Sequence, residues 1–471
     1  MEPQSLKTIY LIGVGGIAMG TLASMLKEKG HRVAGSDQNL YPPMSTHLES
    51  LGIPVCQGYH AQNPSRFSPD IVIVGNVVRR DNPEAQAILQ NGVPYLSMPQ
   101  AIDRFFLPHH QSLVVAGTHG KSTTSSLLAW VLNHGGMSPS AFIGAFMKNW
   151  GASYRLGTGQ YMVIEGDEYD TAFFDKGPKF LHYRPHIAVI TSIEYDHADI
   201  FPDFDSVLKA FRNFVELIPT TGCLVVNADD PHCLAVSRFC KGKVFTYGTS
   251  EQADWRLCGV DFLLREVRFR VRDPLSDTEK ELVSRLPGRH NLGNTLATMA
   301  VASLLGLGKD QLQEAILAFE GVKRRQDIVG ESRGVLIIDD FAHHPTAVKE
   351  TLQGLRLFYP DKRLIAAFEP RTNSSRRSVF QSAYAAAFHE ADCVCIKDPP
   401  GLETIPQAER LNAEKLVEDI SKRQKDAHFF RNTELLMKFL MSYCSSGDVV
   451  VCMSNGSFDG LPQKLLQGLE E

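Results

Sequence analysis

The sequence lacks the features that mark secreted and membrane-spanning proteins. Its first residues contain no apolar stretch of the kind found in signal peptides. No run of about 18 apolar residues, the length that a membrane-spanning helix needs, occurs anywhere in the chain. We therefore expect neither export nor a membrane partner, and we expect the protein to work in the cytoplasm.

Cysteine usage gives no sign of a disulfide framework. The nine cysteines are an odd number scattered over the whole length, whereas disulfide-rich domains carry closely spaced, even sets. The only close pair is Cys393 and Cys395, inside the apolar segment 391–398. A zinc site would need a second pair, so we expect both cysteines to be structural residues of a buried strand.

A basic charge balance, low-complexity segments and fixed-period repeats are also missing. The net charge of −5 argues against a general nucleic-acid binder, which would present a basic face, so we expect no nucleic-acid partner. A chain of 471 residues is too long for one hydrophobic core. Its length predicts roughly three domains of ordinary size.

Residues 8–37 predict a strand, a glycine turn, an amphipathic helix and a second strand that ends at Asp37. Gly13, Gly15 and Ala18 have the spacing of a dinucleotide-binding turn, and an acidic residue follows about twenty positions later. Taken alone, this pattern indicates NAD. Any Rossmann-like domain that presents a helix N-terminus to a diphosphate needs the same glycines, however, including a domain that binds a UDP-sugar.

A second glycine loop lies at residues 112–133, where a short apolar run breaks at Gly117 and a helix begins after Gly120. A strand, a glycine loop and a helix in this order direct backbone N–H groups and the helix dipole toward an anion. In such a loop Lys121 reaches the terminal phosphates of ATP and Ser122 binds Mg²⁺. The loop is shorter than the general pattern, because Val115 stands where a glycine is usual.

Apolar runs that end in acidic or polar clusters continue through the chain, and they predict an α/β fold. The central part adds a small antiparallel subsheet within 244–286, and βα units resume near 321–330 without a glycine fingerprint. We predict three α/β domains, a Rossmann-like N-terminal domain, a central P-loop ATPase domain and a Rossmann-like C-terminal domain. Their predicted bounds are 1–110, 111–328 and 329–471.

The combination of several motifs in one order resembles the Mur ligase family, whose ATP-dependent enzymes join a carboxylate to an amine. These motifs are GTHGKSTT (117–124), EGDEYD (165–170), EYDHADIF (194–201), NADD (227–230), RHNLGN (289–294) and DDFAHHPTAV (339–348). The resemblance runs nearly end to end. A carboxylate is a poor electrophile, so such an enzyme first transfers the γ-phosphoryl group to it and then lets the amine attack.

The resemblance implies ATP and Mg²⁺ as cofactors and assigns residues to both. Lys121, Glu165 and His197 are the implied catalytic residues, and Ser122, Glu165 and His197 the implied metal ligands. Hard oxygen ligands suit Mg²⁺. The implied ATP-binding residues are Gly117, Thr118, His119, Gly120, Lys121, Ser122, Thr123, Asn294, Arg325, Asp340 and His343.

Within the family, the segments YPPMS (41–45) and MSNGSF (453–458) resemble members that attach a whole murein tripeptide, L-Ala-γ-D-Glu-meso-diaminopimelate, to UDP-N-acetylmuramate. These two small molecules are the implied substrates. The implied UDP-muramate-binding residues are Gly15, Gly16, Ser36 and Asp37. The implied peptide-binding residues are Arg371, Asn373 and Asn455.

Other interpretations stay open at this point. Family members that add L-alanine are a close alternative. A different class is an NAD-dependent dehydrogenase built on the first domain, and a third is a nucleotide-gated binding protein without ligase activity. Individual residues also have structural alternatives, because Asn294 would cap a following helix and Arg371 would pair with Glu369 or Asp398.

Overall fold

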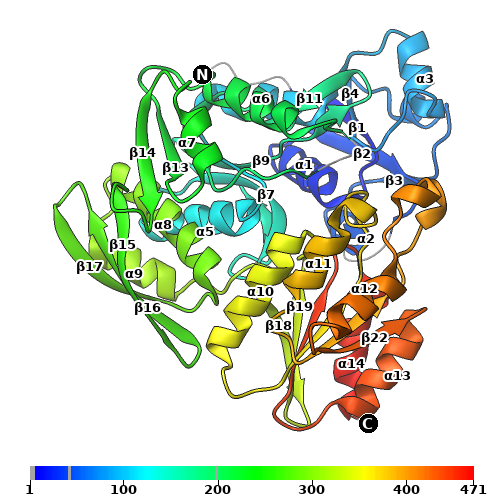
Figure 1. Cartoon of the computed structure of the whole chain (residues 1–471). Helices are drawn as coiled ribbons and strands as arrows, with labels where there is room; N and C mark the ends of the chain where they lie inside the picture. The colour runs from blue at the N-terminus through cyan, green and yellow to red at the C-terminus, as the bar shows by residue number, and fades with distance from the viewer. Residues whose placement is uncertain (1–5, 41–43, 197–199, 471) are drawn as a thin grey trace. The chain divides into compact units, whose positions relative to one another are not determined.

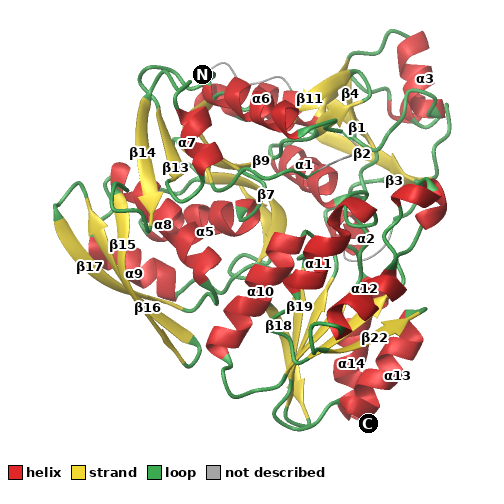
Figure 2. Cartoon of the chain, in the orientation of Figure 1, coloured by secondary structure: helices red, strands yellow, loops and turns green. Residues whose placement is uncertain are grey.

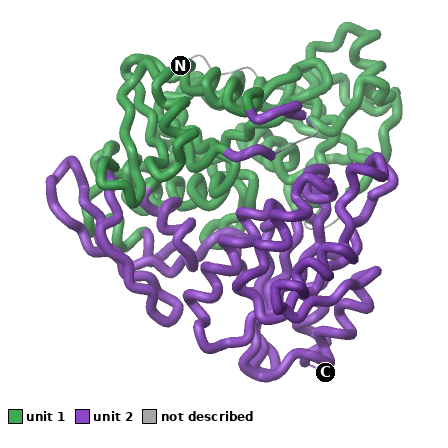
Figure 3. The backbone as a smooth tube through the Cα atoms, in the orientation of Figure 1, with its two compact units in different colours: residues 1–193, 205–253, 297–315 green, residues 194–204, 254–296, 316–471 purple. Residues whose placement is uncertain are grey.

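The computed structural model describes residues 6–40, 44–196 and 200–470, which form two compact units (Figure 3). Unit 1 comprises residues 1–193, 205–253 and 297–315, and unit 2 comprises residues 194–204, 254–296 and 316–471. Helices and strands alternate through both units (Figure 2). The mixed α/β class expected from the sequence is therefore confirmed.

Unit 1 begins with a five-stranded parallel sheet in the order β3-β2-β1-β4-β5 (Figure 1). Its strands are β1 (Thr8–Ile12), β2 (Arg32–Asp37), β3 (Val55–Gln57), β4 (Ile71–Val74) and β5 (Tyr95–Ser97). Its helices are α1 (Ile17–Glu28), α2 (Met44–Ser50), α3 (Pro83–Gln90) and α4 (Met98–Phe105). The strand order reverses at β1, and ligands of open α/β sheets bind beside the carboxyl end of such a strand.

Seven further strands of unit 1 form a second sheet in the order β14-β13-β12-β6-β9-β7-β8. They are β6 (Gln111–Ala116), β7 (Ser140–Met147), β8 (Ala152–Arg155), β9 (Tyr161–Gly166), β12 (Pro185–Ile190), β13 (Cys223–Asn227) and β14 (Lys243–Gly248). All pairs are parallel except β7 with the edge strand β8. The chain first extends this sheet on one side of β6 and later on the other, so β6 is its switch point.

The helices of this part are α5 (Lys121–His134), α6 (Phe204–Val215) and α7 (Pro231–Ser237), and a small hairpin joins β10 (Asp170–Ala172) to β11 (Asp175–Pro178). Two more helices, α8 (Arg289–Leu304) and α9 (Lys309–Leu317), contribute residues to both units.

Unit 2 contains the small antiparallel subsheet that the sequence predicts. Its strands are β15 (Trp255–Leu263), β16 (Glu266–Asp273) and β17 (Thr278–Ser284). Along β16 buried and exposed residues alternate, as they do in a strand with one solvated face.

A six-stranded sheet in the order β18-β19-β23-β20-β21-β22 forms the rest of unit 2. Its strands are β18 (Asp327–Ser332), β19 (Val335–Asp340), β20 (Leu364–Phe368), β21 (Cys393–Lys397), β22 (Asp426–Phe430) and β23 (Val449–Met453). Its helices are α10 (Pro345–Phe358), α11 (Gln381–Ala387), α12 (Ala413–Ser421), α13 (Thr433–Tyr443) and α14 (Leu461–Glu470). Only β18 runs antiparallel.

One face of this sheet packs against α13 and α14. Cys393 and Cys395 belong to the resulting core, together with Leu436, Leu440 and Leu465. All nine cysteines are free, and the burial of this pair supports the structural role predicted from the sequence. In the described part of the chain no helix is long and apolar enough to cross a membrane.

Several details differ from the sequence-based expectation, and one is that β14, at the start of the predicted antiparallel segment 244–286, pairs parallel with β13. The edge strands β18 and β22 were not predicted, because at β22 intermediate burial leaves little hydrophobic periodicity in the sequence. Residues 289–294 were expected to form a loop, but α8 already begins at Arg289. Asn294 therefore lies in the second turn of α8, so it is not the N-cap residue of that helix.

The adjacent residues Leu435 and Leu436 of α13 give a matched test of this core. Leu436 is 0% exposed and Leu435 is 50% exposed. We expect Leu436→Ala to lower the free energy of unfolding by about 2–5 kcal/mol, because it leaves a cavity. Leu435→Ala should change it by less than about 0.5 kcal/mol, as is usual for surface positions. Urea denaturation followed by circular dichroism measures both, and equal losses would contradict the packing described for α13.

Candidate active site

The loop from Gly117 to Ser122, which we call the cradle, joins β6 to α5 at the switch point of the second sheet. Gly117 has φ +134°, and a Cβ on it would lie 2.1 Å from the Thr191 hydroxyl. The backbone N–H of Thr118 donates to the Ser192 carbonyl at 2.8 Å, and that of His119 donates to the Ser192 hydroxyl at 3.1 Å. The end of β12 therefore fixes the path of the cradle, and only glycine fits at its first position.

Lys121 begins α5 and turns its side chain back into the cradle. Its Nζ donates to the Gly117 carbonyl at 2.6 Å and to Glu168 at 2.9 Å. Burial alone would lower the pKa of Lys121, but the carboxylates of Glu168 and Asp167 outweigh burial and raise it. The Lys121 ammonium therefore stays charged. It lies at the N-terminus of α5, the end of a helix at which anions bind.

Ser122 and Glu165, two predicted metal ligands, are in direct contact. The Ser122 hydroxyl donates to Glu165 Oε1 at 2.8 Å, and the Gly144 N–H donates to Glu165 Oε2 at 2.7 Å. Burial raises the pKa of Glu165, and the charge of Asp167 raises it further. The third predicted ligand, His197, lies outside the described residues.

The charges around Lys121 leave an excess of negative charge. Asp167 pairs with Lys179 at 2.9 Å, and burial would raise the pKa of Asp167, but Lys179 and Lys121 lower it. Three carboxylates, those of Glu165, Asp167 and Glu168, thus face two ammonium groups. Oxygen donors with a net charge of −1 suit a hard divalent cation.

The first glycine turn of unit 1 is shaped by the end of β2. Asp37 Oδ2 accepts a hydrogen bond from the Gly15 N–H at 2.7 Å, and a Cβ on Gly15 would lie 2.9 Å from that carboxylate. A Cβ on Gly16, the N-cap of α1, would meet nothing within 4 Å. The turn therefore leaves open space at Gly16, where α1 begins.

Ser36, predicted to bind UDP-muramate, is buried and its hydroxyl donates to Glu84 at 2.5 Å. Glu84 also accepts from Asn63 at 2.7 Å. Through its carbonyl Ser36 accepts from the N–H groups of Gly13 and Val14. The structure therefore gives Ser36 the role of holding the glycine turn.

In unit 2 a chain of hydrogen bonds connects Asn294 with Asp340. Asn294 donates to Asn291 at 3.0 Å, and Asn291 donates to Gln326 at 2.9 Å. The Gln326 N–H donates in turn to Asp340 at 2.7 Å.

Thr123, the predicted ATP-binding residue that follows the cradle, lies in the first turn of α5 in unit 1.

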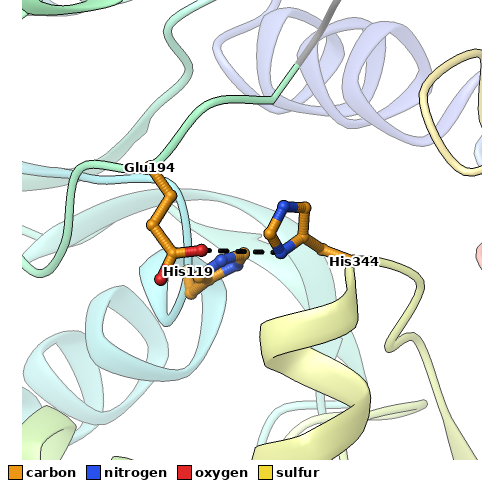
Figure 4. A group of neighbouring side chains, drawn as sticks. All are labelled: His119, Glu194 and His344. Atoms are coloured by element: carbon orange, nitrogen blue, oxygen red, sulfur yellow. Dashed lines mark ion pairs between the residues drawn. The ribbon is translucent and has the colours of Figure 1, made fainter. Parts of the chain in front are cut away.

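Arg325 and His343 both contact Phe341. The Arg325 guanidinium is 4.8 Å from the centre of the Phe341 ring, and His343 Nδ1 is 3.0 Å from the Phe341 carbonyl. The next residue, His344, caps α10 and forms an ion pair with Glu194 at 3.6 Å (Figure 4). Thr346 also donates to Glu194, at 2.7 Å.

The loops after β20 and β23 carry the predicted peptide-binding residues. Arg371 is 41% exposed at its side chain and forms an ion pair with Glu369 at 3.6 Å, which is one of the structural alternatives raised by the sequence. Asn373 accepts from Arg376 at 2.7 Å. The Asn455 Oδ1 atom is buried and has no hydrogen-bond partner among the described residues.

Comparison with known proteins covers almost the whole chain. Residues 8–110 match the model of the Mur ligase family catalytic domain, residues 115–302 the Mur ligase middle domain, and residues 324–456 the Mur ligase glutamate ligase domain. The chain belongs to the Mur ligase family. As a Mur ligase it is an ATP-dependent enzyme that forms carbon–nitrogen bonds, and the dehydrogenase alternative falls away.

Among relatives of this Mur ligase is the UDP-N-acetylmuramate–L-alanyl-γ-D-glutamyl-meso-2,6-diaminoheptandioate ligase of Escherichia coli, 37% identical over 98% of each chain. The UDP-N-acetylmuramate–L-alanine ligase of Rhizobium etli is 34% identical over 99% of this chain and 98% of its own. A crystal structure of a murein peptide ligase from Psychrobacter arcticus matches with a TM-score of 0.74 and 31% identity over 99% of each chain. The predicted three-domain Mur ligase architecture is confirmed.

Sequence reasoning about this Mur ligase missed Glu168 as the partner of Lys121. The residue stands in the acidic segment 165–170, but spacing alone does not tell which carboxylate faces the cradle. Asn291, which belongs to the quoted motif RHNLGN, and Gln326, which follows Arg325 in the chain, were missed as well. The available signal for a role of these two residues was a polar side chain close in sequence to Asn294 or Arg325.

The pH dependence of stability tests the burial of Asp339, the residue of β19 that precedes Asp340. Burial raises its pKa to about 6, although the Arg324 guanidinium lowers it. A carboxyl whose pKa is raised by folding stabilises the protein below its unfolded pKa and loses that contribution as pH rises through about 6.

We therefore expect Asp339→Asn to be more stable than the parent at pH 8, by about 2–3 kcal/mol, and to have no advantage at pH 4. Denaturant unfolding at the two pH values measures this difference. The exposed Asp361→Asn serves as the control. A gain that is equal at both pH values would rule out titration of Asp339 as its cause.

Proposed function

We propose that this Mur ligase joins the carboxylate of UDP-N-acetylmuramate to the amine of the murein tripeptide L-Ala-γ-D-Glu-meso-diaminopimelate, with release of ADP and phosphate. The observation that carries the choice of substrates is the 37% identity with the E. coli enzyme named for them, over 98% of both chains. The geometry of the cradle supports the ATP-dependent step. We also propose the domain bounds 1–110, 111–328 and 329–471.

Phosphoryl transfer to the muramate carboxylate brings two anions together, so it needs positive charge and fixed N–H donors. We assign Lys121 to the transferring phosphate. Its present partner, Glu168, keeps the ammonium charged and in place until a phosphate competes for it. The amides of Gly120 and Lys121, at the N-terminus of α5, are assigned to the other phosphates.

We propose that Ser122 and Glu165 hold Mg²⁺, with His197 as a further ligand. Their hydrogen bond at 2.8 Å supports this assignment, because two oxygen donors at that separation have the spacing of neighbours in one coordination shell. The excess negative charge of the acidic cluster supports it too. When bound, Mg²⁺ would neutralise phosphate and carboxylate charge.

The other predicted nucleotide contacts stand as proposals of the same kind. Gly117, Thr118, His119, Thr123 and Arg325 are assigned to the phosphates, Asp340 and His343 to the ribose and phosphates, and Asn294 to the adenine. The hydrogen bonds from Asn294 through Asn291 and Gln326 to Asp340 support treating these residues as one group.

UDP-N-acetylmuramate is assigned to the first glycine turn. The open space at Gly16 favours a diphosphate at the N-terminus of α1. Gly15 would approach it through its backbone. We assign Ser36 and Asp37 an indirect part, because their side chains already hold the turn.

The far end of the tripeptide is assigned to Arg371, Asn373 and Asn455. A tripeptide brings free carboxylates that L-alanine cannot place at a distance, and a guanidinium matches a carboxylate in shape and charge. The buried Asn455 oxygen without a partner favours a ligand that supplies a donor. We further propose that the enzyme works in the cytoplasm, where thiols stay reduced.

The acceptor experiment tests this function. Purified protein receives ATP, Mg²⁺ and UDP-N-acetylmuramate with either the tripeptide or L-alanine, and phosphate release is followed. We expect release with the tripeptide and a kcat/KM at least about 100-fold lower with L-alanine, since the lost charged contacts are each worth 1.5–3 kcal/mol. Lys121→Ala should be inactive with both acceptors. Better use of L-alanine would replace this proposal with the alanine-adding function.

The metal assignment has its own test. Glu165→Gln should raise the Mg²⁺ concentration needed for half-maximal activity by roughly tenfold or more, because one charged ligand is lost. Asp175→Asn removes a carboxylate elsewhere in unit 1 and should leave the Mg²⁺ titration unchanged. Superimposable titrations of the parent and Glu165→Gln would show that Glu165 does not bind the metal.

A further inference from the structure

Glu369, at the carboxyl end of β20, is a buried carboxylate that no assignment above uses. It is 0% exposed. Its Oε1 accepts from Lys397 Nζ at 2.6 Å, and its Oε2 accepts from the Ser454 hydroxyl at 2.6 Å. Glu369 thus connects the ends of β20, β21 and β23 by side-chain contacts.

A buried charge of this kind is costly unless it is well paired, and removal of one partner leaves the other uncompensated. Lys397 supplies the tight pairing, and its Nζ also contacts Asp459 at 3.3 Å. Arg371 contacts Glu369 only at 3.6 Å, through Nη1. Lys397 and Arg371 thus face two carboxylates, those of Glu369 and Asp459, and the longer contact with Glu369 orients the Arg371 guanidinium.

The side chain of Arg371 packs against the backbone at Gly456. A Cβ on Gly456 would lie 2.3 Å from Cδ and 2.6 Å from Nε of Arg371. The arginine side chain therefore lies directly over this glycine, and any larger residue would displace it. Gly456 is not among the glycines with positive φ, so its backbone conformation does not itself require a glycine.

The neighbouring arginines of the same loop have structural partners. Arg376 donates to the carbonyls of Pro400 and Gly401 at 2.9 and 2.7 Å. Arg377 pairs with Glu409. Arg371, by contrast, contacts Glu369 only at 3.6 Å, packs with its stem against Gly456, and is 41% exposed at its side chain.

We propose that Glu369 and Gly456 are positioning residues that hold the Arg371 guanidinium in one orientation, ready to accept a carboxylate of the acceptor peptide. This inference rests on the proposed function, since it supposes a peptide acceptor. A preorganised guanidinium loses less side-chain freedom on binding, so the peptide binds more tightly.

Steady-state kinetics of two variants test the proposal. Glu369→Gln keeps the side-chain shape and removes the charge, and Gly456→Ala displaces the arginine. We expect each to raise KM for the tripeptide about 10- to 100-fold, the range of a charged hydrogen bond, with KM for ATP and kcat within about threefold of the parent. Glu418→Gln and Gly308→Ala, a charge change and a glycine change at exposed positions, should match the parent.

A tripeptide whose terminal carboxyl groups are amides separates positioning from a general loss of structure. The parent should lose affinity for this analogue, and Arg371→Ala should bind both peptides equally weakly. Glu369→Gln should discriminate between them less than the parent does. Full discrimination by Glu369→Gln, or equal rises in KM for ATP and peptide, would overturn the positioning role.

Three further outcomes are informative. If either variant does not fold, as judged by circular dichroism and thermal melting, the other variant decides the question. If the parent itself shows no tripeptide-dependent phosphate release, the proposed function fails, whatever the variants do. A parent that is active with the tripeptide beside variants that bind it normally refutes only the positioning role.

Discussion

A buried ammonium between carboxylates and a glycine loop is the interaction on which the site in unit 1 depends. Burial lowers the pKa of Lys121, and the facing carboxylates of Glu168 and Asp167 raise it. The acidic cluster in turn would be costly without Lys121 and Lys179. This balance keeps a charged lysine in a nearly buried position, 12% exposed at its side chain, as the proposed contact with a phosphate requires.

The parallel sheets explain why these charges meet. Parallel strands end at the same edge, so polar residues that directly follow buried strands converge there. Glu165 and Glu168 come at the end of β9 and after it, and the cradle follows β6, its neighbour in the sheet. The same rule brings Glu369, Lys397 and Ser454 together at the ends of three neighbouring strands of unit 2.

We propose that loops, and not the fold, distinguish between two acceptors of very different size. The chain is 37% identical to an enzyme named for a tripeptide and 34% identical to one named for L-alanine. A difference this small leaves the fold the same for both. The loops after β20 and β23, with Arg371 held over Gly456, are where a longer and more highly charged acceptor would be distinguished.

Local pattern was enough to predict much of this protein, because apolar runs, glycine turns and helix starts depend on neighbours in the chain. The strands and helices of residues 8–37, the cradle before α5, the small antiparallel subsheet and the family resemblance were all available from the sequence. Only the tertiary structure decided which charged groups meet. Three contacts of this kind join residues that are 28 to 48 positions apart in the chain, namely those of Glu168 with Lys121, of Glu84 with Ser36 and of Glu369 with Lys397. Such pairings depend on strand order, which a single sequence does not encode as a local pattern.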